Sequence, residues 1–154
     1  MNQQDYVQAV EEMKIPASKA LEWTNIVIEK YYYIYNKPDT QSHKYAREQF
    51  DRVVDACKKL VTMIQHIQEK LASNQTNSVD TLEIFIHTLA GPIMEISGGT
   101  KIILIYPYWR PENEQSEDEQ EHIRYIKKIN TAAEYLWSLD RDVILRRHIE
   151  NSNE

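Results

Sequence analysis

The residues best placed for chemistry lie near the C-terminus, in the stretch RDVILRRH at residues 141–148. In a helix, Arg141 and His148 are two turns apart and therefore lie on the same face. A histidine can transfer protons near neutral pH, as catalysis requires. The same stretch also suits the C-terminal end of a helix, because the helix dipole favours cations such as Arg146 and Arg147 there. The stretch is either an active site or the basic end of a helix, and we favour the helix end.

The spacing of Arg141 and His148, close to the end of the last predicted helix, resembles the motif of the HEPN family, many of whose members are RNases. The resemblance covers the eight residues 141–148. It implies that the arginine and the histidine of two subunits meet in one cleft of a homodimer, where they cleave RNA without a metal. A HEPN-like ribonuclease is therefore the alternative function for this chain.

The composition favours one small helical domain that spans residues 1–154. The chain holds only 3 glycines and 5 prolines, too few for a many-turned all-β fold. Its net charge of −6 opposes general binding to nucleic acid, which depends on neutralising phosphates. The single cysteine cannot form an internal disulfide, and the sequence shows neither a signal peptide nor an apolar run that could span a bilayer. We therefore expect a cytoplasmic protein without a membrane partner.

Pairs of glutamate and histidine at helical spacing raise the question of a metal site. Glu119 and His122 form one Glu-x-x-His pair, but a carboxylate-bridged dimetal bundle needs two such pairs and two further glutamates. Glu83 and His87 are four residues apart, a spacing more typical of a surface contact. We therefore predict no metal site and no cofactor. Cys57 falls on an apolar helix face, where a free cysteine acts as a small hydrophobic residue.

The clearest structural signal is an apolar seam between residues 41 and 72. Two interleaved sets of apolar residues each recur every seven residues: Phe50, Cys57, Ile64 and Leu71, and Ala46, Val53, Leu60 and Ile67. This pattern predicts one long helix, about 48 Å in length at 1.5 Å per residue. Val54 and Val61 widen the seam, which favours burial within a bundle over a two-stranded coiled coil.

Other segments also show helical spacing. The apolar residues before Pro16 predict a first helix that ends there, because proline disfavours helical geometry at the preceding residue. Residues 17–35 predict a second helix, and residues 117–149 predict a last one that begins with acidic residues. Residues 79–90 fit either a helix or a strand, and we favour the helix.

A Gly-Gly pair lies between two β-branched runs in the segment 93–106. At this position Gly98 and Gly99 predict the tight turn of a β-hairpin. Such a hairpin must pack on the helices or on another chain, since an isolated hairpin is marginal in water. The expected fold class is therefore mainly α: a bundle of four or five helices, two of them long and antiparallel, with a small β-hairpin inserted before the last helix.

Two short stretches concentrate the aromatic residues. YYYIY and YPYW supply the candidate binding residues Tyr31, Tyr32, Tyr33, Tyr35, Tyr106, Tyr108 and Trp109. Tyr and Trp are frequent interface anchors because they bury a large area and carry a polar group, although the same tyrosines could equally pack the end of the bundle. By elimination we expect a regulatory, protein-binding module without catalytic activity, such as an adaptor, an inhibitor or an immunity-type factor. Its partner would be another protein, with a homodimer as a further option.

Overall fold

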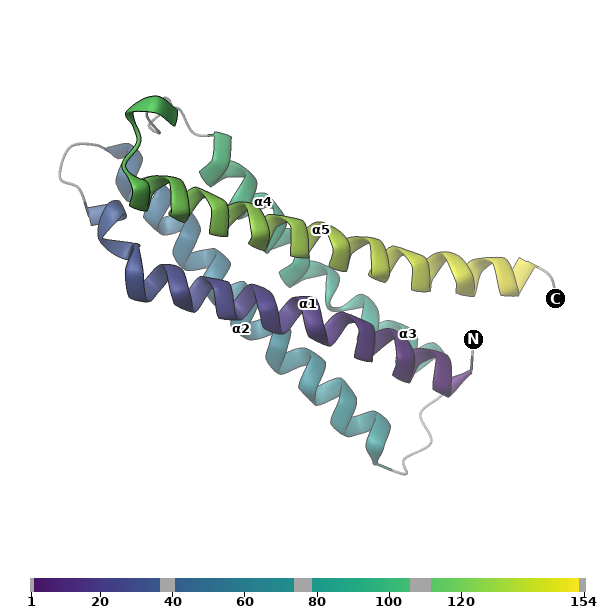
Figure 1. Cartoon of the computed structure of the whole chain (residues 1–154). Coiled ribbons are helices and arrows are strands. Elements are labelled where there is room, and N and C mark those ends of the chain that lie inside the picture. Colours follow the sequence, from purple (N-terminus) through teal and green to yellow (C-terminus); the bar gives the residue numbers. More distant parts are fainter. Residues whose placement is uncertain (1, 37–40, 74–78, 106–111, 153–154) are drawn as a thin grey trace.

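The computed structural model describes residues 2–36, 41–73, 79–105 and 112–152, and these are almost entirely helical (Figure 1). The described residues form five α-helices: α1 (Gln3–Lys30), α2 (Gln41–Ala72), α3 (Val79–His87), α4 (Ala90–Ile105) and α5 (Glu117–Ser152). Two short 3-10 helices, η1 and η2, cover Tyr32–Asn36 and Glu112–Glu114. α3 and α4 follow one another along the chain, and together they form one side of the bundle. The expected mainly α bundle is confirmed.

The apolar seam of α2 forms the centre of the core, as its heptad spacing predicted. The side chains at both seam positions are buried from residue 46 to residue 67, and Leu71 is half-buried. Both α1 and α4 pack along this helix, and α5 packs on α1 and α4. Burial raises the pKa of the Cys57 thiol on this seam to about 12, so the thiol stays protonated and acts as an apolar group.

The first helix is longer than the sequence indicated. The predicted break at Pro16 is wrong, because α1 runs from residue 3 to residue 30 with this proline inside it. Met13 and Ala17, on either side of Pro16, are both buried in the core, so tertiary packing outweighs the backbone hydrogen bond that proline cannot donate. The carbonyl that loses this bond belongs to Glu12, an exposed residue at which water can supply the missing donor.

The direction of the helices differs from the expectation in one respect. α1 runs antiparallel to both α2 and α5, since Gln68 donates a hydrogen bond to Glu11 and Arg146 lies 3.9 Å from Asp5. The two longest helices, α2 and α5, therefore run in the same direction, and the expected antiparallel arrangement of the two long helices is wrong (Figure 1). In the chain, α2 follows α1 and α5 follows α3 and α4, and each runs opposite to the helices before it, as in an up-and-down bundle.

The predicted β-hairpin at residues 93–106 is also wrong, because α4 continues as a helix through the Gly-Gly pair and the described residues contain no strand. Its buried residues are spaced as one helix face: Pro92, Ile93, Ile96, Gly99, Thr100 and Ile103. Gly99 allows close packing and does not form a turn. A Cβ atom at this position would lie 2.6 Å from Cγ2 of Val53 on α2. The small residue therefore sets how closely α4 approaches α2.

α3 confirms the helix that was favoured over a strand for residues 79–90, and a break at Thr88 and Leu89 separates it from α4. Pro92 accounts for the break, because it has no N–H to donate to the carbonyl of Thr88 and its ring clashes with that carbonyl in a regular helix. The Thr88 hydroxyl donates to the carbonyl of Phe85 within α3. Because of this break, α3 is not collinear with α4. The two helices therefore contact different faces of α5.

Candidate interaction surface on α5

α5 matches the helix predicted for residues 117–149 and carries two different seams. The inner seam faces the core and includes Ile126, Ile129, Leu136 and Val143. A second set of residues, which we call the outer seam, is spaced alternately four and three apart: Asn130, Glu134, Trp137, Arg141, Ile144 and His148. This spacing places the six residues on one continuous face of the helix.

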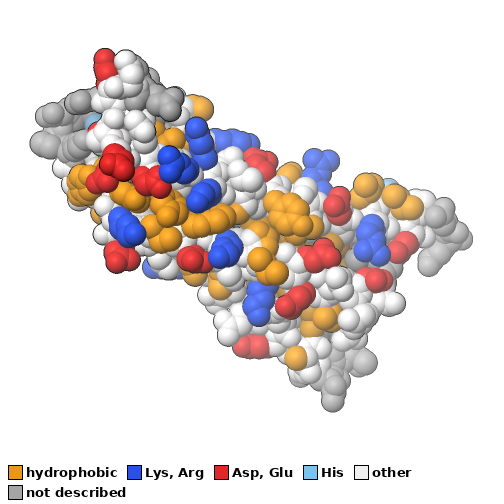
Figure 2. Space-filling view, viewed as in Figure 1, with side chains coloured by type: hydrophobic (Ala, Val, Ile, Leu, Met, Phe, Trp, Pro, Cys, Tyr) orange, Lys and Arg blue, Asp and Glu red, His pale blue; other side chains and the backbone are white. Residues whose placement is uncertain are grey.

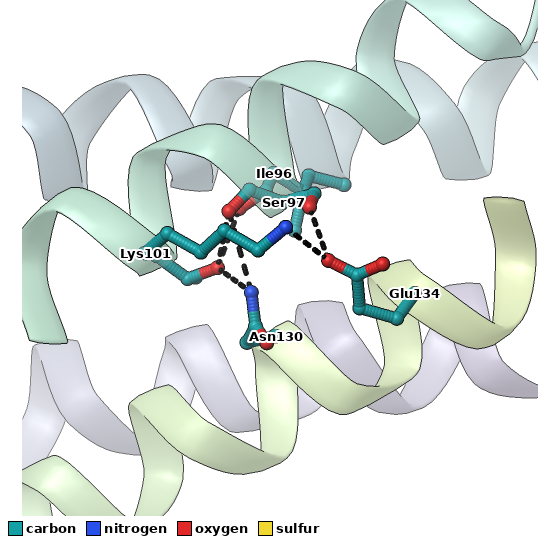
Figure 3. A network of polar contacts seen from close by, with 6 residues as sticks. Ile96, Ser97, Lys101, Asn130 and Glu134 are labelled. Atoms are coloured by element: carbon teal, nitrogen blue, oxygen red, sulfur yellow. Dashed lines mark hydrogen bonds and ion pairs between the residues drawn. The ribbon is translucent and has the colours of Figure 1, made fainter.

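α4 contacts the first two positions of the outer seam, of which Asn130 is half-buried and Glu134 is exposed (Figure 3). Asn130 donates from Nδ2 to the Thr100 hydroxyl at 2.9 Å and to the Ser97 carbonyl at 3.3 Å. Glu134 accepts a hydrogen bond from the Ser97 hydroxyl at 2.7 Å and lies 2.6 Å from Nζ of Lys101. Lys101, and after it Ser97, lower the pKa of the Glu134 carboxyl. In the covered part of the outer seam, an acid on α5 thus pairs with a lysine on α4.

α3 lies beside the later part of α5, but on a neighbouring face. Glu83 Oε2 lies 3.4 Å from Nε of Arg147, and His87 Nδ1 lies 3.8 Å from Oδ2 of Asp140. Asp140 and Arg147 each precede an outer-seam residue by one position, which rotates them by about 100° around the helix. Beyond Glu134, the outer seam borders a hollow to which the described residues of α3 and α4 contribute no lining, and we call this part of the seam uncovered. Its residues Trp137 and Ile144 are themselves half-buried, and Trp137 packs against the core.

The uncovered part of the outer seam lines a shallow, open hollow. Its lining residues all belong to α5: Trp137, Ser138, Arg141, Asp142, Ile144, Leu145 and His148. Leu145 is 57% exposed, and Ile149, one turn further along, is 51% exposed. Figure 2 shows hydrophobic side chains at the surface among charged ones toward the C-terminal end of α5. Two bulky aliphatic side chains are thus left in solvent close to two basic ones.

Arg141 and His148 lie on one face of α5, as predicted, and both side chains are exposed. The hollow that they line contains no residue from another described helix. A single chain therefore holds the two groups on an open surface and does not enclose them in a cleft. Chemistry that depends on a concave, enclosed site would need a second molecule to cover them.

Most of the YYYIY stretch links helices at one end of the bundle. Tyr31 and Tyr32 are half-buried, and the Tyr32 hydroxyl donates a hydrogen bond to Asp51 on α2 at 2.9 Å. Tyr33 is 52% exposed, and its hydroxyl donates to Asp118 on α5. These contacts fit the interpretation that the stretch packs the end of the bundle. Three further candidate binding residues lie outside the described part of the chain: Tyr106, Tyr108 and Trp109.

Tyr35, the fourth tyrosine of this stretch, is buried in the core. Its ring stacks on Phe50 with 5.3 Å between the ring centroids, and its hydroxyl contacts Nε2 of His122. Burial lowers the pKa of the His122 imidazole to about 3, so the ring is neutral at physiological pH. Neither side chain is accessible to a partner or a substrate, and both stabilise this end of the bundle.

Among the described residues, no three His, Cys, Asp or Glu side chains lie close enough together to hold a metal ion. Glu119 and His122, the Glu-x-x-His pair, are both buried in the bundle. Glu83 and His87 contact two different residues of α5 and do not share a ligand. None of the helices in the described ranges is long and apolar enough to cross a membrane.

The sequence patterns missed Asp140, whose carboxylate lies between α3 and α5. Asp140 is 1% exposed, and within the described part of the chain neither of its oxygens has a hydrogen-bond partner. Burial raises the pKa of this carboxyl, while the charge of the largely exposed His87 lowers it. The spacing of the inner seam does mark its position, because Asp140 lies four residues after Leu136 and three before Val143. An aspartate is seldom fully buried, so its residue type indicates a surface position instead.

Asp140→Asn is expected to raise the free energy of unfolding at pH 7 by about 1 kcal/mol, because it removes a buried charge without changing the size of the side chain. The pKa of the Asp140 carboxyl is higher in the folded chain than its ordinary value of 3.8 in the unfolded chain. As the pH falls toward 3.8, the folded wild type therefore takes up a proton here more readily than the unfolded chain does, which stabilises the wild type. The advantage of the variant should therefore shrink as the pH falls from 7 toward 4. Chemical denaturation across this pH range measures it.

Asp142→Asn, which removes the same charge from an exposed position of the same helix, is the matched control and should change stability little. Repeating the comparison in a His87→Gln background removes the contribution of the histidine charge. A lower stability of Asp140→Asn at pH 7 in both backgrounds would show that the carboxylate is not destabilising.

Comparisons with protein-family models, with curated proteins and with solved structures find no match for this chain. The resemblance to the HEPN motif therefore stays confined to residues 141–148. On the surface of α5, exposed apolar and basic side chains lie together.

Proposed function

We propose that this chain is a cytoplasmic protein-binding module of regulatory function, such as an adaptor, an inhibitor or an immunity-type factor, and that it binds through the uncovered part of the outer seam. The main support is Leu145, which is 57% exposed and lines one hollow together with Trp137 and Arg141. Apolar surface in contact with water is unfavourable, and contiguous exposed apolar patches are typical of interaction sites. Trp and Arg are among the residue types in which binding energy concentrates.

A binding role fits the geometry better than a catalytic one. Catalytic groups act best in a concave site that excludes water, whereas Arg141 and His148 lie on the open surface of one helix. Cys57 and His122, two further residues with catalytic chemistry, are buried in the core. The module would therefore act by occupying its partner and would perform no reaction of its own.

The second candidate is the HEPN-like, metal-independent ribonuclease. One observation favours it: Arg141 and His148 share one exposed face, with a hollow between them. This function requires a homodimer in which the two copies of this face meet and enclose a cleft. The arginine and the histidine would then act on RNA together, with His148 as the proton-transfer group.

Two experiments on the whole chain separate the proposals. A photo-cross-linking amino acid in place of Leu145 is expected to capture a different protein in the source cells. The same amino acid in place of Lys59, an exposed residue on α2, is expected not to capture it. The purified chain is expected not to cleave RNA, and His148→Ala should unfold at the same temperature as the wild type.

Two results together would establish the ribonuclease and overturn the binding module. The first is capture of nothing but further copies of the chain at position 145. The second is metal-independent RNA cleavage that both Arg141→Ala and His148→Ala abolish, by a factor of about 100 or more, while the variants remain folded.

A further inference from the structure

We propose that the partner contributes an acidic amphipathic helix, which packs along the uncovered part of the outer seam in line with α4. This inference rests on the proposed function and specifies the chemistry of the partner. Three features support it: the register of the outer seam, the sign of its charge, and the position of α3.

The uncovered part of the outer seam continues an interface that α4 has already begun. Asn130 and Glu134, which form polar contacts with α4, are followed seven residues later by Trp137 and Arg141. A helix that continued the line of α4 would therefore meet the later residues in the register of a heptad repeat. From residue 137 to the end of α5 the seam is about 20 Å long at 1.5 Å per residue, which is enough for a partner helix of about four turns.

The apolar residues of this surface have the spacing that a helix recognises. Trp137 and Ile144, both half-buried, are seven residues apart on the outer seam, and Leu145 adds an exposed side chain beside them. A partner helix with apolar residues at three- and four-residue spacing can cover all of them along one stripe. The partner should therefore be amphipathic, with its apolar stripe against α5.

The charge at the heptad positions of the outer seam reverses beyond the contacts with α4, although Asp142, which lines the same hollow, lies beside Arg141. In the covered part, Glu134 of α5 pairs with Lys101 of α4. Arg141 occupies the equivalent position one heptad later, and His148 the next. A partner helix that preserves the pairing must carry acidic residues where α4 carries its lysine. A symmetric pair of copies would instead bring the basic residues of the two faces together, without an acidic residue of the outer seam opposite Arg141.

The chain does not fill this surface with its own α3. The break before Pro92 takes α3 out of the line of α4, and Leu82 and Ile86 then anchor it in the core. Its contacts with Asp140 and Arg147 hold it on the neighbouring face of α5. The position in line with α4 is thus left for a helix from another molecule.

The test uses the whole chain and two designed peptides of about three heptads. Both carry leucine at every a and d position and alanine or glutamine at the outward positions. One has glutamate and the other lysine at every e and g position, and fluorescence anisotropy of the labelled peptide reports binding. We expect the glutamate peptide to bind the wild-type chain at least about tenfold more tightly than the lysine peptide.

Arg141→Glu is expected to reverse this preference, because it changes the sign of the charge at the centre of the surface. Lys58→Glu makes the same change at an exposed position of α2 and should leave the preference as it is in the wild type. Both replaced side chains are exposed, and circular dichroism verifies that both variants fold.

Equal affinity for the two peptides, or an unchanged preference in Arg141→Glu, would overturn the proposal. Tighter binding of a labelled single-stranded RNA, lost in Arg141→Glu, would overturn it in favour of a nucleic-acid surface. Dimerisation of the wild type in sedimentation, lost in Leu145→Glu, would assign the surface to a second copy. If cross-linking at position 145 captures a different protein while the peptides show no preference, only the chemistry of the partner is wrong and the binding function stands.

Discussion

Tyr35→Ala is expected to lower the free energy of unfolding by about 3–5 kcal/mol, as is usual for large buried aromatic side chains. Tyr35 is buried, stacks on Phe50 and contacts His122 through its hydroxyl. Its removal leaves a cavity at this end of the bundle and deprives a buried imidazole of a polar contact. Urea denaturation followed by circular dichroism measures the loss.

The control is Tyr33→Ala, two residues earlier in the same stretch. Tyr33 is exposed and its hydroxyl bonds to Asp118 at the surface, so the expected loss is below about 1 kcal/mol. Equal unfolding midpoints for the two variants would contradict the burial of Tyr35. Such a result would also make the YYYIY stretch a candidate binding surface again.

Gly99→Val is expected to lower the free energy of unfolding by about 1–3 kcal/mol through overpacking. A Cβ atom alone would lie 2.6 Å from Cγ2 of Val53, and 3.6 Å from the backbone oxygen of Gln49. The side chain of Val53 is short and branched, so it cannot move aside as a long flexible chain could. α4 would have to shift away from α2, and a lower thermal midpoint reports this.

Gly98→Ala separates this packing effect from helix propensity. Gly98 precedes Gly99 on the same helix but is exposed, and nothing lies within 4 Å of a Cβ placed on it. Alanine there should raise stability by about 0.5–1 kcal/mol, because it restricts the unfolded chain and favours the helix. A Gly99→Val variant as stable as the wild type would show that α4 does not pack closely against Val53 of α2 at this position.

Periodicity predicted those helices whose apolar residues follow one face over several turns. The α2 seam from Ala46 to Ile67 is buried as its spacing required, and α5 has almost the predicted bounds. The predictions failed where a local signal competed with packing. Pro16 indicates a helix end when its neighbours are unknown, and Gly98 with Gly99 indicates a turn. In the bundle, the buried residues around them supply enough packing to keep both segments helical.

The candidate surface could be predicted only in part. The spacing of Arg141 and His148 already placed them on one face, and the three-and-four spacing back to Asn130 could have indicated a second seam. Which part of this seam is covered depends on the path of α3, and no pattern within α5 reports that path. The burial of Asp140, by contrast, could have been predicted from its position between Leu136 and Val143 on the inner seam, although aspartate is seldom fully buried.

The short length of α3 has a consequence for how the bundle opens. Its nine residues are fewer than the roughly 12–15 that an isolated helix needs, so α3 is helical only while it is docked. Its release would expose the core beside Asp140 without separating α2 from its neighbours, and would cost less than complete unfolding. Amide protons of α3 should therefore exchange with solvent through local opening, whereas those at the centre of α2 should exchange only through global unfolding. A helix bound along the outer seam would stabilise the end of α5 on which α3 docks, and would slow the exchange of α3 without touching it.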